Sequence, residues 1–229
     1  SLYKWQVRKV ARHLAIPSEI AERQPFPGPG LSVRVVGEIK PDKLASLKKA
    51  TTITEKKFAK YKPSQYFAAI LDNMEQSNHP LLRAIQETVA NSLNIPLSAV
   101  FIKIFKNKAT GMIEGKRTYG EIAAIKAETA EGKVQRASID NLVSLQKKII
   151  KENPTLTRVF YCIQESKRKQ PYVIVTRAIE TPDFLTAKVA EISWETLIET
   201  SEEILNVCKN VSSVYYDVTP KPPATVEME

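Results

Sequence analysis

The sequence predicts a two-layer α+β chain in which a helical junction precedes two related β-α-β-rich subdomains with antiparallel or mixed sheets. Three observations lead to this prediction: an internal repeat, an alternation of strand-like and helix-like apolar patterns, and a proline–glycine loop near the N-terminus. We place the junction at residues 1–36 and the main domain at 37–229, divided into subdomains at about 37–165 and 166–229.

The repeat aligns residues 138–163 on 193–218 without gaps, an offset of 193 − 138 = 55 residues. Leu142/Leu197 and Ile149/Ile204 fall on the buried stripe of a helix, and a strand follows each helix. Further apolar strands, at 119–127 and 172–179, precede the two helices, so each unit is β-α-β. Five of the 26 aligned pairs are identical, which leaves convergence open as an alternative to duplication.

Other segments complete the two layers. Residues 41–60 and 79–93 predict helices that start near Pro41 and Pro80, while 65–71 and 101–105 predict strands. Gly111, Gly115 and Gly120 punctuate a predicted hairpin that ends at Tyr119.

The loop at residues 24–30 reads Gln24-Pro25-Phe26-Pro27-Gly28-Pro29-Gly30. Proline fixes φ and restricts the preceding residue, whereas glycine adopts positive φ and admits a close neighbour, so we expect a shaped loop. A plain proline-rich linker is the alternative. The amphipathic stretch 2–14 precedes this loop, and the apolar strand expected at 31–36 follows it.

Two terminal segments resemble GMP synthase, at the junction of its ATP pyrophosphatase domain and its C-terminal dimerisation domain. The resemblance covers the chain apart from residues 72–100. The family typically ends in Trp-Glu, where this chain has Met228-Glu229. The matching segments are Trp5-Gln6-Val7-Arg8-Lys9-Val10-Ala11-Arg12, Glu22-Arg23 with the loop to Leu31, Arg34-Val35-Val36-Gly37-Glu38, and Val214-Tyr215-Tyr216-Asp217-Val218-Thr219-Pro220-Lys221-Pro222-Pro223-Ala224-Thr225-Val226-Glu227-Met228-Glu229.

The resemblance also implies a binding site for xanthosine monophosphate (XMP), with no catalytic residue in this chain. A lysine suits a phosphate, and a carboxylate accepts hydrogen bonds from purine N–H groups. Arg117 and Gln170 each stand two residues before a tyrosine that opens a repeated strand, so we expect them to face one ligand. Many relatives have Gly-Asp-x-Arg where this chain reads Gly115-Lys116-Arg117, a shorter turn. The implied XMP-binding residues are Arg117, Gln170, Lys221, Thr225, Glu227, Pro27, Gly28, Pro29 and Gly30.

The parent reaction implied by the resemblance is ATP-dependent adenylation of XMP at its C2 oxygen, followed by attack of ammonia released from glutamine. The sequence contains no Ser-Gly-Gly-x-Asp-Ser run for pyrophosphate, and neither cysteine has a histidine nearby in sequence. We therefore expect this chain alone to make no GMP and to bind no cofactor. ATP and Mg²⁺ would act in the parent enzyme, together with its pyrophosphatase and glutamine amidotransferase domains.

Composition narrows the remaining functions. The net charge is +9 and eight lysines fall within residues 40–62, but no aromatic side chain among them is spaced to stack bases, so nucleic acid is not expected. A basic RNA-binding protein and a purely structural dimerisation module stay open as alternatives. The two cysteines and two histidines offer neither a disulfide framework nor a metal site. We expect a cytoplasmic homodimer without a membrane span.

Overall fold

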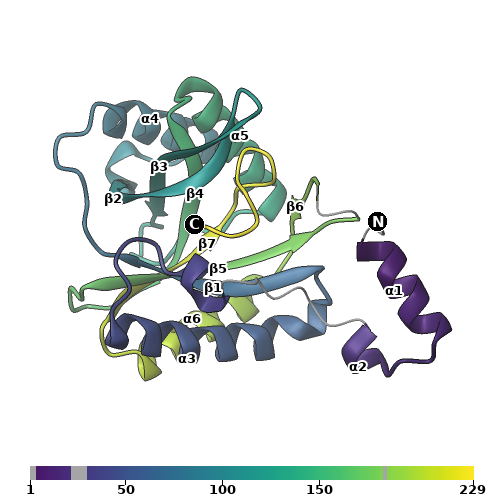
Figure 1. The fold of residues 1–229 in the computed structure, drawn as a ribbon. Coiled ribbons are helices and arrows are strands. Elements are labelled where there is room, and N and C mark those ends of the chain that lie inside the picture. Colours follow the sequence, from purple (N-terminus) through teal and green to yellow (C-terminus); the bar gives the residue numbers. More distant parts are fainter. Residues whose placement is uncertain (1–3, 22–29, 183–184) are drawn as a thin grey trace.

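The computed structural model describes residues 4–21, 30–182 and 185–229, and it is built around one mixed β-sheet (Figure 1). Neighbouring strands follow the order β1–β5–β7–β4–β3–β2, and β6 pairs with β5. The strands are β1 (Gln65–Asp72), β2 (Val100–Ile113), β3 (Lys116–Ala127), β4 (Leu156–Glu165), β5 (Tyr172–Glu180), β6 (Lys188–Val189) and β7 (Val211–Asp217).

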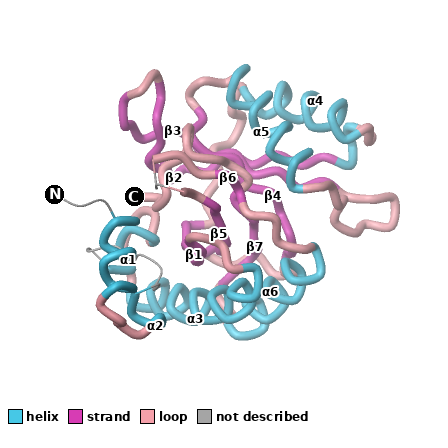
Figure 2. The backbone as a smooth tube through the Cα atoms, turned by 90° about the vertical axis from the view of Figure 1, so that its right-hand side faces the viewer, coloured by secondary structure: helices cyan, strands magenta, loops and turns pink. Residues whose placement is uncertain are grey.

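The four long helices that follow the junction pack on one face of this sheet. On that face α4 and α5 lie against β2 and β4, at the top in Figure 2, and α3 and α6 lie against β1 and β7, at the bottom. Alternate strand residues, such as Val159 and Tyr161 of β4, face this helical layer, while Phe160 and Cys162 face the opposite side. The α+β class is thus confirmed. The helices are α3 (Pro41–Phe58), α4 (Leu81–Leu93), α5 (Ile139–Glu152) and α6 (Trp194–Val207).

The predicted repeat has a counterpart in two parallel β-α-β units, β3-α5-β4 and β5-α6-β7. Ser138 and Ser193 are the N-caps of α5 and α6, with ψ angles of 150° and 148°, and each side chain accepts a hydrogen bond from the backbone three residues on. The two units meet where β4 pairs with β7, and that pairing is antiparallel. The units therefore run in opposite directions across the sheet.

The predicted hairpin is β2–β3. Its turn consists of Glu114 at φ 50° and Gly115 at φ 76°, and two successive positive φ angles are typical of a tight β-hairpin turn. Gly111 has another role, because a Cβ there would lie 2.5 Å from the Cβ of Thr157 and 2.9 Å from the carbonyl oxygen of Pro223. The missing side chain lets the C-terminal segment lie against β2.

The N-terminal part contains α1 (Lys4–His13), α2 (Ser18–Ala21) and the 3-10 helix η1 (Gly30–Arg34), the last where the sequence predicts a strand. Two further 3-10 turns are η2 (Ala59–Tyr61) and η3 (Leu97–Ala99). Among the described helices, none combines the length and apolarity needed to cross a membrane.

Most of the lysines within residues 40–62 are exposed, but Lys43 is buried. Its side chain is fully buried, and its Nζ donates to the carbonyl of Val36 at 2.7 Å and to Asp72 Oδ1 at 2.8 Å. The start of α3 is thereby tied to both the junction and the end of β1.

The sheet is continuous across position 165, where the sequence places a subdomain boundary. β1, from the predicted first subdomain, pairs with β5 of the second along eight residues, and α3 packs against β1 and α6. The division into two subdomains stays a prediction from the repeat.

Candidate functional site

Residues 218–229, which we call the tail, fold back over the helix-free face of the sheet after β7 ends (yellow in Figure 1). The main chain of Lys221 pairs with that of Ala187. Met112 N then donates to Pro223 O at 2.7 Å, and Thr110 N donates to Met228 O at 2.9 Å. Both limbs of the tail thus lie along β2, at the end of the sheet where β3 begins and β5 and β7 end.

Two buried arginines hold the middle of the tail. Nη1 of Arg158 lies 2.8 Å from Asp217 Oδ2, and Nη1 of Arg177 lies 2.6 Å from the same oxygen. The Nη2 atoms of both arginines donate to the carbonyl of Thr225, at 3.0 and 3.2 Å. Burial lowers the pKa of Arg158 to about 10, although the charge of Asp217 opposes this, so the guanidinium is protonated at neutral pH. Asp217 neutralises one of the two buried positive charges.

A third arginine binds the tail from the junction. Arg34 lies at the end of η1, and its guanidinium stacks 4.2 Å from the ring centre of Phe67. Its Nε donates to Glu227 Oε2 at 3.2 Å, and its Nη2 donates to Oε1 at 3.4 Å. Nε2 of Gln65 also donates to Oε1, at 3.3 Å. The carboxylate of Glu227 is therefore oriented by groups from η1 and β1.

Arg117 lies beside the tail as well. Its Nη2 donates to the carbonyl of Glu229 at 3.3 Å, and the neighbouring Tyr119 hydroxyl donates to Glu229 Oε2 at 3.0 Å. Arg117 pairs in register with Met112, whose backbone N–H binds Pro223, two residues from Lys221. Lys221 and Glu227 belong to the tail, and Arg117 contacts the tail at Glu229.

Thr225 belongs to the same tail, but its hydroxyl is engaged within the protein. The hydroxyl lies within hydrogen-bond distance of the carbonyls of Thr110 and Glu227, at 3.0 and 2.7 Å, one of which accepts its single proton, and it accepts from Arg158 at 3.0 Å. Thr225 thus anchors the tail, and the ligand contact that the resemblance implies for it stays a prediction.

Gln170 lies elsewhere, contrary to the expectation that it faces the same ligand as Arg117. It stands just before β5, and its carbonyl accepts from Asn73 at 2.8 Å. Because β3 and β5 run in opposite directions, their entry ends lie at opposite ends of the sheet. Nine residues of β5, at about 3.3 Å each, separate Gln170 from the end of the sheet that carries the tail.

Of the proline–glycine loop, Pro27, Gly28 and Pro29 lie outside the described residues. Gly30 opens η1 with φ 73°, a conformation that favours glycine, and η1 leads directly to Arg34. The side chain of Arg34, at the end of η1, contacts Glu227.

Sequence reasoning missed Arg34, Arg158, Arg177 and Asp217 as tail-binding residues. A signal was available for two of them, because Arg158 and Arg177 are single basic residues inside otherwise apolar strands. A charge in such a position needs a partner, but the strand pattern does not say which residue supplies it.

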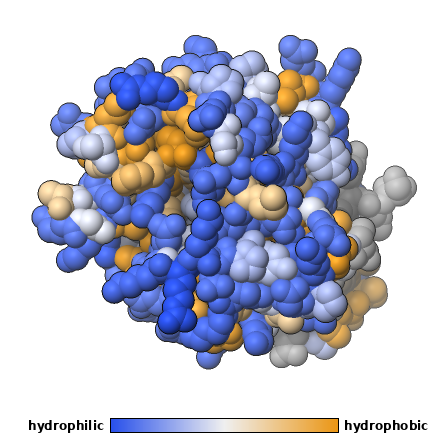
Figure 3. Space-filling view, turned by 90° about the vertical axis from the view of Figure 1, so that its left-hand side faces the viewer, coloured by the Kyte–Doolittle hydropathy of each residue, from blue (hydrophilic) through white to orange (hydrophobic). Residues whose placement is uncertain are grey.

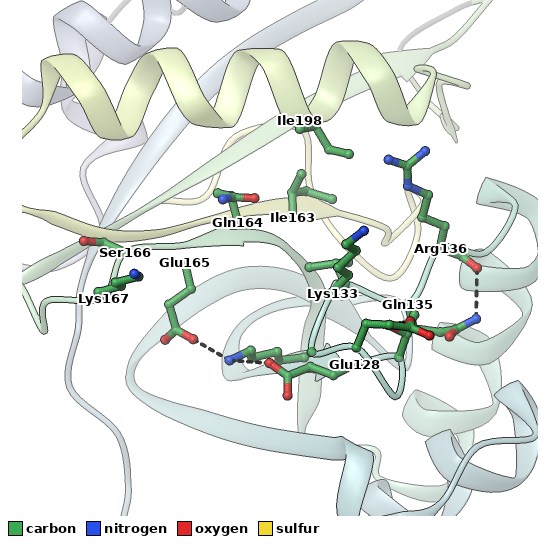
Figure 4. Close-up of a pocket in the computed structure, with 15 residues that line it drawn as sticks. Glu128, Lys133, Gln135, Arg136, Ile163, Gln164, Glu165, Ser166, Lys167 and Ile198 are labelled. Atoms are coloured by element: carbon green, nitrogen blue, oxygen red, sulfur yellow. Dashed lines mark hydrogen bonds and ion pairs between the residues drawn. The ribbon is translucent and has the colours of Figure 1, made fainter.

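A separate hollow of about 800 Å³ lies among the segment 128–136, the end of β4 and α6 (Figure 4). Lys126 sits there between Glu128 at 2.9 Å and Glu165 at 2.7 Å. These charges pair with one another, and none of the predicted site residues within the described ranges lines the hollow. Across the described part of the chain, no group of three or more His, Cys, Asp or Glu side chains is placed to hold a metal ion.

Comparison with known proteins finds similar sequences along the whole chain. Residues 162–228 match the family model described as GMP synthase C terminal domain, which includes Arg177, Asp217 and the tail to Met228. A protein of Sulfurisphaera tokodaii, named as a subunit of glutamine-hydrolysing GMP synthase, is 37% identical over 228 residues, which cover 100% of this chain and 55% of that protein.

Two further relatives are named as the same subunit of GMP synthase. The protein of Saccharolobus solfataricus is 37% identical and that of Halobacterium salinarum 31%, each over 228 residues, with 54% and 47% of the relative covered. The chain thus spans about half the length of the curated relatives it matches. The resemblance to the C-terminal portion of GMP synthase is confirmed.

Proposed function

We propose that this chain, which resembles the C-terminal portion of GMP synthase along its whole length, contributes XMP binding and homodimerisation to the synthesis of GMP. One observation carries the proposal: the tail is clamped at one end of the sheet, with Lys221, Glu227 and Arg117 around it. A tail that served only as an edge strand would not need three arginines to set its position.

The chemistry of these side chains fits a purine monophosphate. Lys221 and Arg117 supply positive charge and N–H donors to the phosphate, and Glu227 accepts a hydrogen bond from a purine N–H. The resemblance to GMP synthase also implies XMP contacts from Pro27, Gly28, Pro29 and Gly30, of which Gly30 lies within the described residues. Gln170, at the far end of the sheet, is left out of this proposal.

The whole enzyme would activate the C2 oxygen of XMP with ATP and then replace the adenylate with ammonia from glutamine, which gives GMP. ATP and Mg²⁺ would be held outside this chain, whose sequence has no Ser-Gly-Gly-x-Asp-Ser run. The residues of this chain bind and orient XMP; none of them transfers a group.

Partners follow from the same reasoning. The relatives are named as one subunit of a glutamine-hydrolysing enzyme, so we propose that a separate glutaminase subunit supplies the ammonia. We also propose a homodimer. Large apolar side chains such as Met74 and Phe101 are exposed, at 52% and 50%. Separately, Figure 3 shows hydrophobic side chains gathered at the upper left of an otherwise mainly hydrophilic face, as expected of an interaction surface. A cytoplasmic location stays a prediction from the low cysteine content.

The test is Lys221→Ala in the full-length protein that contains this chain. A lost hydrogen bond to a charged phosphate costs about 1.5–3 kcal/mol, so the Michaelis constant for XMP should rise about 10- to 150-fold. Lys148→Ala, on the exposed surface of α5, is the matched control and should leave that constant unchanged. An unchanged Michaelis constant and turnover in Lys221→Ala would show that the tail is only structural.

A further inference from the structure

Arg34 joins two segments that lie 193 residues apart in the sequence. It ends the 3-10 helix that leaves the proline–glycine loop, and its side chain is only 1% exposed. Arg34 donates to the two carboxylate oxygens of Glu227 from two different N–H groups, Nε and Nη2. This paired arrangement fixes the plane of the carboxylate as well as its position. The loop exit and Glu227 are thus held in one geometry.

Glu227 nevertheless keeps capacity for a ligand. A carboxylate offers about four lone-pair sites, and Arg34 with Gln65 occupies three of them. The side chain of Glu227 is 17% exposed, so it is not sealed from solvent. One further hydrogen bond, such as one from a purine N–H, completes the set.

The main chain of the tail does not depend on Arg34. Arg158 and Arg177 bind the carbonyl of Thr225, and two β2 amides bind Pro223 and Met228. Loss of the Arg34 guanidinium would therefore remove two of the three hydrogen bonds that orient the carboxylate of Glu227, while the main-chain contacts of the tail remain.

We propose that Arg34 is a positioning residue of the XMP site, which orients the carboxylate of Glu227 for a purine N–H. The inference rests on the proposed function, because it assigns Arg34 a role at that same site. The effects of Arg34 and Glu227 on XMP binding are then coupled, because the guanidinium acts only through this carboxylate.

A double-mutant cycle in the full-length protein tests this proposal. Arg34→Gln and Glu227→Gln should each raise the Michaelis constant for XMP at least about tenfold, with a smaller change in turnover. The Michaelis constant of the double variant should be no higher than that of whichever single variant binds XMP more weakly, because the two side chains act as one unit. Arg136→Gln is the matched control, since it removes an exposed arginine that pairs with Glu195 of α6 and not with a residue of the tail.

Arg34→Lys guards against misfolding, because it keeps the positive charge and loses the paired geometry. Its Michaelis constant should lie between those of the wild type and Arg34→Gln. Two results would overturn the coupling and leave the XMP site standing. One is that the effects of Arg34→Gln and Glu227→Gln on the Michaelis constant simply multiply. The other is that both Arg34 variants bind XMP like the wild type while Lys221→Ala binds it weakly. If Lys221→Ala also binds XMP normally, the proposed function itself fails.

Discussion

Asp217→Asn should destabilise the fold strongly, because this carboxylate is the shared partner of two buried guanidinium groups. Asp217 is fully buried, its Oδ2 accepts from both Arg158 and Arg177, and its Oδ1 accepts from Thr219 N at 2.9 Å. Asparagine keeps the shape and part of the hydrogen bonding but removes the negative charge. Two positive charges then remain in an apolar layer with only carbonyl and hydroxyl oxygens to face them.

Removal of one partner of a buried ion pair typically costs about 3–5 kcal/mol. A chain of this size loses about 2–4 °C of melting temperature per kcal/mol, so the transition should fall by about 6–20 °C. Thermal unfolding followed by circular dichroism measures the shift, and urea unfolding gives the free energy independently.

The control for this measurement is Arg136→Gln, which breaks an exposed ion pair and should cost no more than about 1 kcal/mol. A loss below about 1 kcal/mol for Asp217→Asn would refute the reasoning. It would mean that the two arginines are satisfied by tail oxygens alone, and that Asp217 does not hold the cluster together.

The remaining predictions concern the tail, acid stability and turnover. Gly111→Ala places a Cβ against Thr157 and the carbonyl of Pro223, so it should cost about 1–3 kcal/mol of stability and also raise the Michaelis constant for XMP in the full-length protein; wild-type stability would contradict the close packing. Burial raises the pKa of Glu121, but hydrogen bonds from Thr155 and His79 outweigh it and lower that pKa. The carboxylate of Glu121 therefore contributes fully to stability above its unfolded pKa, about 4.3, and this contribution is lost as the pH falls through the lower folded pKa. The difference in unfolding free energy between wild type and Glu121→Gln should shrink between pH 5 and 3. A difference that grows over this range would contradict the lowered pKa of Glu121. The isolated chain should form no GMP from ATP, XMP and ammonia, as measured by chromatography, and turnover by the chain alone would show that an ATP site has been overlooked.

The sequence by itself determined the local helices and strands and the similarity between the two β-α-β repeats. The aligned repeat predicts a helix and then a strand after each of Ser138 and Ser193, where α5 with β4 and α6 with β7 are found, and the strands predicted at 119–127 and 172–179 correspond to β3 and β5. These signals are local, since capping and amphipathic periodicity depend on residues within a few positions of each other. The terminal motifs added the resemblance to GMP synthase and located the tail.

Only the tertiary structure decided which residues meet. The antiparallel β4–β7 pairing sends the two repeats in opposite directions, so it separates Gln170 from Arg117 although their sequence positions are equivalent. Arg34, Arg158 and Arg177 come from three separate segments and acquire partners only when the tail crosses the helix-free face. Strand order and long-range ion pairs depend on how distant segments bury one another's charges and apolar faces, and no short sequence window contains that information.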